Sequence, residues 1–116
     1  MSRRRKIGYR RYTATAKQHN GKQDEAGQPT YGTESDWTPI VSGWPVELIG
    51  VTGGERIRGR QVAAEATHVI YGEYYGGQGI TPEARCVVDG RTFNVVNVLD
   101  MDGDHRELRV ELKAEL

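Results

Sequence analysis

The clearest alternation of apolar and polar residues lies near the C-terminus of the chain, between Arg85 and Leu112. Three runs there have the length and composition of β-strands, namely Ala84–Val88, Arg91–Leu99 and Glu107–Ala114. Asp89-Gly90 separates the first two runs, and Asp-Gly between apolar runs is typical of a type I′ hairpin turn, because both turn positions need a positive φ. Met101–Asp104 forms the next turn. The pattern therefore predicts a meander of three antiparallel strands.

The last strand of this meander alternates without interruption. Its apolar residues are Leu108, Val110 and Leu112, and the charged residues between and after them are Arg109, Glu111 and Lys113. Successive side chains of a strand point to opposite faces. One face is therefore expected to join a core and the other to face water.

The middle strand changes phase. Phe93 and Val95 share one face, whereas Val96 and Val98 share the other. This change predicts either a sheet covered on both faces or a β-bulge near Val95-Val96, and a strongly curved sheet needs such a bulge.

The chain upstream of the meander predicts further short elements. In order they are a strand at Tyr9–Gln18 with Tyr12, Ala14 and Ala16 on one face, a polar loop at His19–Ser35, a strand at Asp36–Ile49, a turn at Thr52–Glu55, one or two helical turns within Glu55–Glu65, a strand at Ala66–Tyr75 and a loop at Gly76–Gly79. Pro39 and Pro45 favour an edge or a bulge in the second strand. The polar loop is longer than compact domains normally contain without a functional reason, so it is a candidate functional element.

Composition agrees with a mainly β chain. The 116 residues suit one domain (residues 1–116), and 15 glycines with 4 prolines favour short strands and many turns. The low apolar share indicates a thin core, or one completed by neighbouring subunits. We expect no membrane span and no signal peptide, because no long apolar run is present. A lone Cys86 excludes an internal disulfide framework, fits a reducing cytosol and is expected to be a small buried apolar residue.

The zero net charge conceals an uneven distribution. Residues 1–22 hold eight of the sixteen basic residues and no acid, so the remaining 94 residues hold eight bases against all sixteen acids. Residues 1–8 are expected to form a flexible basic arm. Such an arm on an acidic body suggests an acidic protein partner or nucleic acid, or a tail that only adds solubility.

No catalytic, metal or cofactor site is expected. Asp100–Asp104 resembles a calcium loop, but its glycine stands at the fourth position instead of the sixth, so a turn is the better interpretation. The histidines at 19, 68 and 105 are scattered, and with one cysteine they form no zinc pattern. Gly72–Gly79 lacks the lysine and Ser/Thr of a phosphate-binding loop. The sequence predicts no enzyme.

Two exposed surfaces have alternative interpretations. Arg56, Arg58 and Arg60 share one face if the segment is extended, and the patch either is solvated beside Glu55 and Glu65 or contacts an acidic partner. Tyr74-Tyr75 could stack on bases. Tyrosines at a strand end more often belong to a core or an interface.

The order of features along the chain carries a resemblance. It is Arg11-Tyr12-Thr13-Ala14, the long loop, Trp37 and Trp44, Gly54-Glu55, Gln61–Ala64, Thr67-His68, Ile80-Thr81-Pro82, Asp89–Phe93, Asp100–Asp104 and a final Glu-Leu-x-Val-x-Leu strand. In this order the chain resembles the head–tail joining (head-closure, stopper or adaptor-type) proteins of tailed bacteriophages. The resemblance covers nearly the whole chain.

The resemblance implies a small antiparallel β-barrel of about six to seven strands, with a long loop in its N-terminal half and one short flanking helix. It also implies a structural protein of the virion neck, made in the bacterial host cytoplasm. A homo-oligomeric ring of six or twelve copies would close the DNA channel after packaging and dock the tail. Its partners would be the portal or adaptor ring on the head side, a tail terminator or tail tube protein on the tail side, and packaged DNA bound without sequence specificity, with no membrane and no cofactor.

The resemblance and the charge pattern together name two sets of candidate contact residues. Those expected to contact a partner ring are Arg3, Arg4, Arg5, Lys6, Arg10, Arg56, Arg58 and Arg60. Those expected to form a channel plug or docking loop are His19, Asn20, Gly21, Lys22, Asp24, Glu25, Gln28 and Tyr31. The alternatives are a small nucleic-acid-binding barrel that uses Arg3–Lys6, Arg10, Arg11, Tyr74 and Tyr75, or another neck or tail part such as a tail terminator.

Overall fold

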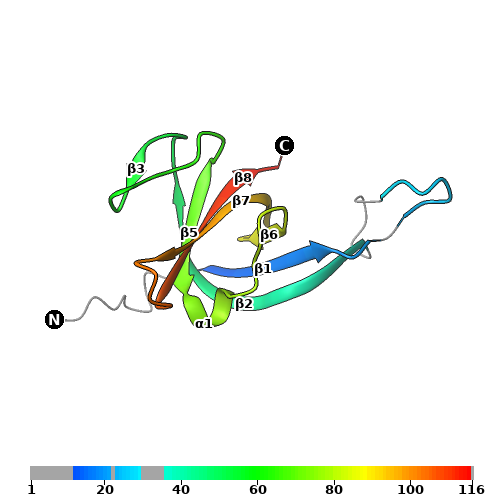
Figure 1. The fold of residues 1–116 in the computed structure, drawn as a ribbon, viewed down its shortest axis with the longest axis horizontal. Coiled ribbons are helices and arrows are strands. Elements are labelled where there is room, and N and C mark those ends of the chain that lie inside the picture. Colours follow the sequence, from blue (N-terminus) through cyan, green and yellow to red (C-terminus); the bar gives the residue numbers. More distant parts are fainter. Residues whose placement is uncertain (1–11, 22, 30–35, 116) are drawn as a thin grey trace.

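Six strands close into an antiparallel β-barrel in the computed structural model, which describes residues 12–21, 23–29 and 36–115 (Figure 1). The elements are β1 (Tyr12–His19), β2 (Trp37–Gly50), β3 (Arg56–Ile57), β4 (Arg60–Gln61), β5 (His68–Glu73), α1 (Tyr74–Gly77), β6 (Arg85–Val88), β7 (Arg91–Met101) and β8 (Glu107–Ala114). Around the barrel the order is β1-β2-β5-β8-β7-β6, and β6 pairs with β1 to close it. The prediction of a small antiparallel barrel is confirmed.

The predicted C-terminal meander is present as β6, β7 and β8. Asp89 and Gly90 connect the first two strands with φ values of 53° and 71°, as a type I′ turn requires. The register of β7 against β8 shifts between Val95 and Asn97. The predicted bulge near Val95-Val96 is therefore confirmed.

The first two strands form a long hairpin that extends beyond the barrel. β1 pairs with β2 from Tyr12 to His19, but with β6 only over Ala14–Lys17 among the described residues. β2 reaches β5 only at its C-terminal end, over Glu47–Gly50. The outer part of the hairpin therefore projects away from the barrel (Figure 1, right). Its register shifts twice, between Ala14 and Lys17, so of the edge or bulge expected for the proline-containing strand, a bulge is present.

The barrel interior is apolar. Its core includes Ala14, Ala16, Trp44, Val46, Ile70, Cys86, Val88, Phe93, Val110 and Leu112. The inward positions of β1 and β8 match the predicted alternation, and Cys86 is buried as expected.

A second cluster lies on the outer side of the barrel wall, under the segment between β2 and β5. It consists of Val62, Ala66, Val69, Tyr71 and Met101. The helical turns predicted within Glu55–Glu65 are absent, and β3 and β4 form a two-stranded hairpin instead (Figure 1, upper left). The prediction was wrong because Arg58 and Gly59 both adopt positive φ, at 53° and 79°, which makes them a hairpin turn.

Two other expectations need correction. The short helix is α1, at Tyr74–Gly77, where the sequence predicted the end of a strand at Tyr75 and the start of a loop at Gly76. The charged face of β8 does not face water as a whole, because Arg109 is 0% exposed and Glu111 is 1% exposed, whereas Lys113 is exposed. The segment containing β3 and β4 covers this face, and periodicity along β8 alone contains no information about that cover.

Candidate functional site

The end of the β1–β2 hairpin holds the described residues of the predicted plug or docking loop together. His19 ends β1, and its ring makes an edge contact with that of Trp37 at 5.5 Å between centroids. The backbone N–H of Asn20 donates to the carbonyl of Asp36 at 2.9 Å, which continues the hairpin by one more bond. The loop is therefore carried at the tip of a paired ribbon.

Asp24 organises the part of this loop that the structure describes. Its Oδ1 accepts from the backbone N–H groups of Ala26 and Gln28, both at 2.9 Å. Gln23 and Pro29 form an isolated bridge, and Gly27 takes a positive φ of 83°. Residues 23–29 are thus a small turn stabilised by an aspartate. Glu25 lies in this turn and is exposed, while Lys22 and Tyr31 lie outside the described residues.

Arg85 connects the projecting hairpin to the barrel. Its guanidinium carbon lies 4.2 Å from the centre of the Trp37 ring, and its Nη2 is 3.2 Å from Oε2 of Glu115 near the C-terminus. The contact places a cation against an aromatic face. It joins the first residue of β2 to the first residue of β6.

The three arginines of the second predicted contact patch do not share one environment. Arg58 turns back onto the barrel, with Nη2 2.9 Å from Oε1 of Glu47 and Nη1 3.4 Å from Oε1 of Glu107. Its guanidinium also lies 3.7 Å above the ring of Tyr71. Arg56 donates to the carbonyl of Gly59 at 2.8 Å, and both Arg56 and Arg60 are exposed. The ion pairs expected with Glu55 and Glu65 are replaced, for Arg58, by pairs with Glu47 and Glu107.

A buried ion pair lies beneath this hairpin and was missed in the sequence. Nη2 of Arg109 is 2.7 Å from Oε2 of Glu111, and it also donates to the carbonyl of Gln61 at 2.9 Å. Nη1 donates to the carbonyl of Ile57 at 2.9 Å, and the second oxygen of Glu111 accepts from the N–H of Ala63 at 3.2 Å. The side chains of Arg109 and Glu111 on β8 therefore hold both strands of the β3–β4 hairpin against the barrel by hydrogen bonds.

The electrostatics of this pair follow from its surroundings. Burial by itself would lower the pKa of Arg109, but hydrogen bonds and charge interactions with Tyr71 and Glu111 raise it overall. The guanidinium of Arg109 therefore stays charged. One signal in the sequence could have indicated the pair. Val69 and Tyr71 alternate on the facing strand, so the outer row opposite Arg109 and Glu111 is apolar.

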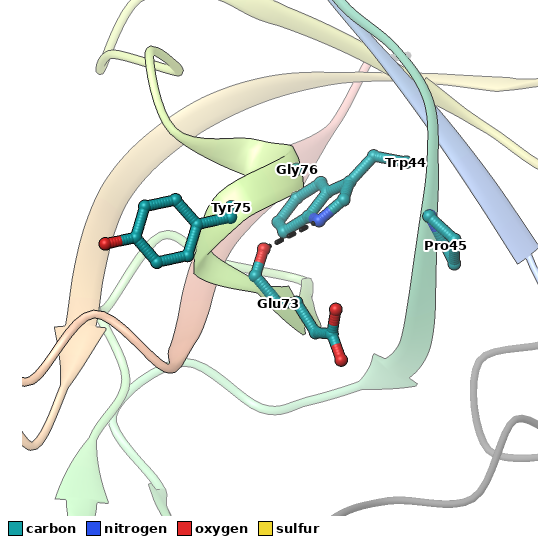
Figure 2. A pocket seen from close by; sticks show the side chains of 5 residues that line it. All are labelled: Trp44, Pro45, Glu73, Tyr75 and Gly76. Carbon is teal, nitrogen blue, oxygen red and sulfur yellow. Dashed lines mark hydrogen bonds between the residues drawn. The ribbon is translucent and has the colours of Figure 1, made fainter.

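A shallow hollow of about 90 Å³ lies beside α1 (Figure 2). It is lined by Trp44, Pro45, Glu73, Tyr75 and Gly76. The indole Nε1 of Trp44 donates to the carbonyl of Glu73 at 2.9 Å, as the dashed line in Figure 2 shows. The side chain of Tyr75 is 73% exposed, whereas the ring of Tyr74 stacks on His105 at 4.2 Å. The two adjacent tyrosines thus face different surroundings.

The glycines of this region serve close packing on the indole ring. A Cβ at Gly72, Gly76 or Gly77 would lie 2.5, 2.6 or 2.3 Å from an atom of Trp44. No other residue type fits without displacing the ring. The glycine-rich stretch, which lacks the lysine of a phosphate-binding loop, is therefore explained by this contact.

Two titratable groups have clearly shifted pKa values for structural reasons. Burial raises the pKa of the Cys86 thiol to about 12, which leaves it protonated at neutral pH. Burial, and secondarily the charge of Arg91, lowers the pKa of His68, whose ring lies 5.0 Å from that of Phe93. Neither group lies at the hairpin tip or in the hollow.

Two kinds of site are not found in the described part of the chain. No group of three or more His, Cys, Asp or Glu residues there could hold a metal ion. No helix among the described residues has the length and apolarity needed to cross a membrane. The predicted contacts Arg3, Arg4, Arg5, Lys6 and Arg10 lie outside the described residues, so the structure does not place them.

No curated protein matches the chain. The family of phage head completion proteins matches residues 5–115, which is almost the whole sequence and includes every strand described above. A match of that extent assigns the chain to a family of structural phage proteins found in the virion. The chain therefore belongs to the phage head completion protein family.

Proposed function

We propose that this chain is a ring-forming component of the phage neck. Six or twelve copies would lie between the portal or adaptor ring and the tail terminator or tail tube, close the DNA channel after packaging and offer the surface on which the tail docks. Membership of the head completion family supports a role in closing the head. A closed cyclic ring also suits a protomer of low apolar content, since contacts with neighbours would complete the buried surface.

The projecting β1–β2 hairpin is the observation that carries the proposal. It holds a polar loop away from the barrel wall, and every described residue from Gln23 to Pro29 is exposed. In a ring, one such hairpin per copy would converge on the channel or on the facing ring. The loop residues His19–Ser35 are therefore the proposed plug or tail-docking element.

Charge supports a channel through which DNA passes without sticking. Residues 23–116 hold eight bases against sixteen acids. Affinity for DNA comes mainly from neutralisation of phosphates by lysine and arginine, so an acidic barrel attracts it weakly. Arg56 and Arg60 on the β3–β4 hairpin are exposed and are the described candidates for contact with an acidic neighbouring ring.

Deletion of Gly21–Thr33 tests the hairpin assignment. The barrel should remain folded, because these residues lie beyond the last paired positions His19 and Trp37, while DNA retention or tail joining should be impaired in assembled particles. Thermal unfolding of the isolated variant and DNA content of the particles are the two measurements. Asp104→Ala, in the exposed β7–β8 turn, is the control and should leave both unchanged. Loss of the fold on deletion would contradict the assignment.

Electron microscopy of particles that carry a tagged copy tests the location. A ring of label at the neck is expected. Label spread over the capsid, or confined to the distal tail, would overturn the proposal.

Salt dependence separates the neck role from nucleic-acid binding. The alternative rests on the basic residues 1–11 and on exposed Tyr75, which could stack on bases. A DNA-binding barrel would show strong binding at low salt and a steep loss of affinity as salt rises. Negligible affinity at physiological salt is expected for the neck protein.

A further inference from the structure

The chain leaves β1 with an asparagine followed directly by a glycine. Asn20 and Gly21 are both exposed, and they come immediately after His19, where β1 ends. At such a pair the main-chain nitrogen of the second residue can attack the side-chain amide carbon of the first. Glycine favours this attack, because it has no side chain to shield its nitrogen. The pair is therefore a candidate for modification by its own main chain.

The nitrogen of Gly21 already contacts a base. Its N–H donates a hydrogen bond to Nδ1 of His19 at 3.2 Å. Because Nδ1 accepts, the imidazole in this contact is the neutral form with its proton on Nε2. A general base must lie within hydrogen-bond reach of the proton that it removes, and His19 meets this requirement. The proton that the imidazole contacts is the one whose removal makes the nitrogen of Gly21 nucleophilic.

The end of the hairpin holds these groups together. The ring of His19 lies 5.5 Å from that of Trp37, with which it pairs across the ribbon. The N–H of Asn20 donates to the carbonyl of Asp36 at 2.9 Å, which restrains the main chain before the reacting nitrogen. Gly21 has a φ of 82°, and apart from its chain neighbours no described residue lies within 4 Å of the position that a Cβ would take. The nitrogen of Gly21 is thus held against its base and is not crowded by the rest of the described chain.

The two other asparagines of the sequence lack this arrangement. Asn94 and Asn97 lie in β7, and each is followed by a valine, whose branched side chain crowds the nitrogen. The N–H of Val95, which follows Asn94, donates to the carbonyl of Ala84 at 2.9 Å. Asn94 is exposed like Asn20, so the two differ in the residue that follows and not in access to water.

We propose that Asn20-Gly21 is a site of self-catalysed deamidation, with His19 as the general base. Nδ1 of His19 takes the proton of the Gly21 N–H, and the nitrogen forms a bond with Cγ of Asn20. The bond between Cγ and Nδ2 of Asn20 then breaks, and Nδ2 leaves as ammonia with the proton that the imidazolium returns. The product of this step is a cyclic succinimide.

Water completes the reaction, and no other reactant is needed. Addition of water at Cγ breaks the bond from Cγ to the nitrogen of Gly21 and leaves an aspartate. Addition at the main-chain carbonyl carbon of Asn20 breaks the other bond to that nitrogen and leaves an isoaspartate, in which the chain runs through Cγ. Either product adds one negative charge to the end of the hairpin, since a carboxylate is ionised at neutral pH. The proposal goes beyond the neck role and does not depend on it.

Peptide mapping of the folded, full-length protein tests the site. The protein is incubated at neutral pH, and mass spectrometry follows the replacement of NH2 by OH at each asparagine. Asn20 should convert at least about tenfold faster than Asn94 and Asn97, with both aspartate and isoaspartate as products. No conversion at Asn20, or equal rates at Asn20 and Asn94, would overturn the proposal.

Two matched substitutions test the base. His19→Gln should slow the conversion of Asn20 by about tenfold or more, because hydroxide must then remove the proton. His105→Gln, the same change in the exposed β7–β8 turn, should leave the rate unchanged. Thermal unfolding shows whether both variants are folded.

Free imidazole separates the loss of a base from a change in loop shape. Imidazole in the buffer should accelerate the conversion of Asn20 by a larger factor in the His19→Gln variant than in the unmodified protein, because it supplies the missing base. If His19→Gln leaves the rate unchanged, or if imidazole accelerates both proteins by the same factor, His19 is not the base.

Discussion

The two sides of the barrel wall at β5 and β8 are built on different principles. The inner side is a continuous apolar core, with Ile70 facing Val110 and both 0% exposed. The outer side is equally buried at Tyr71 and Arg109, which are also 0% exposed, but it combines apolar residues with an ion pair. The inner side is closed by the barrel itself, whereas the outer side is closed by a short hairpin.

The difference shows what each kind of burial requires. Apolar burial needs matching shapes and is tolerant of which residues supply them. The Arg109–Glu111 pair needs defined partners, and it obtains them from the main chain of Ile57, Gln61 and Ala63. A two-residue strand pair has little stability of its own. The buried pair therefore positions the β3–β4 hairpin, whose exposed arginines are candidates for partner contact.

Removal of one member of the buried pair should have the largest effect. Arg109→Met leaves the Glu111 carboxylate buried without its cation, which we expect to lower the free energy of unfolding by about 3–5 kcal/mol. Urea denaturation measures the change. Lys113→Met, on the same row of β8 but exposed, is the matched control and should change it by less than about 0.5 kcal/mol.

The double variant Arg109→Met/Glu111→Leu sharpens the comparison, because it makes the outer side resemble the inner one. Part of the lost stability should return, since an apolar replacement removes the unpaired charge, but the main-chain groups of Ile57, Gln61 and Ala63 lose their partners. The amide of Val62, which bonds to Glu55 across the hairpin, should nevertheless exchange faster than in the unmodified protein. If Arg109→Met alone lowers the free energy of unfolding by less than about 1 kcal/mol, water must reach the carboxylate of Glu111.

Loss of the outermost contact of the same region should have a smaller effect. Arg58→Ala removes the contact with Tyr71 and the half-exposed pairs with Glu47 and Glu107, for an expected loss of about 1 kcal/mol. Arg60→Ala, at an exposed position of the same hairpin, should lose almost nothing. If Arg58→Ala and Arg60→Ala lower the stability to thermal unfolding equally, Arg58 contributes no more than a solvated side chain.

The smallest effect concerns pH. The pKa of His68 is lower in the folded protein than its ordinary value of 6.5, so the unfolded chain binds the proton more readily. Its contribution to stability is therefore complete above pH 6.5 and decreases as the pH falls toward the folded pKa. His68→Gln should flatten this part of the stability profile, measured by denaturation between pH 7 and pH 5. If His68→Gln leaves the slope of stability against pH unchanged, His68 is not the cause of this pH dependence.

Much of the barrel could be predicted because its signals are local. The Asp89-Gly90 turn, the alternation of Leu108, Val110 and Leu112, and the phase change at Val95-Val96 each lie within a few residues, and the structure confirms all three. The Arg58-Gly59 turn was missed, because arginine is an unusual residue at positive φ and the strands beside it are only two residues long.

The candidate contact surfaces could be predicted only in part. The polarity of the loop at the end of the β1–β2 hairpin was evident from its composition. The different contacts of Arg56, Arg58 and Arg60 could not be predicted from the sequence. The partners of Arg58 are Glu47 and Glu107, which lie 11 and 49 residues away from it. The role of Gly72, Gly76 and Gly77 likewise depends on Trp44, which reaches them from another strand.

The sequence by itself determined the inner core, the closing meander and the separation of a basic N-terminal segment from an acidic body. Periodicity, turn residues and charge counts depend on positions that are close in the sequence, so they can be read without knowledge of the fold. Only the tertiary structure decided which polar side chains are buried and which surfaces adjoin. Arg109 and Glu111 look solvated along β8, but a hairpin about fifty residues earlier in the chain covers them. Burial of charge depends on what packs against it, and that information is not local.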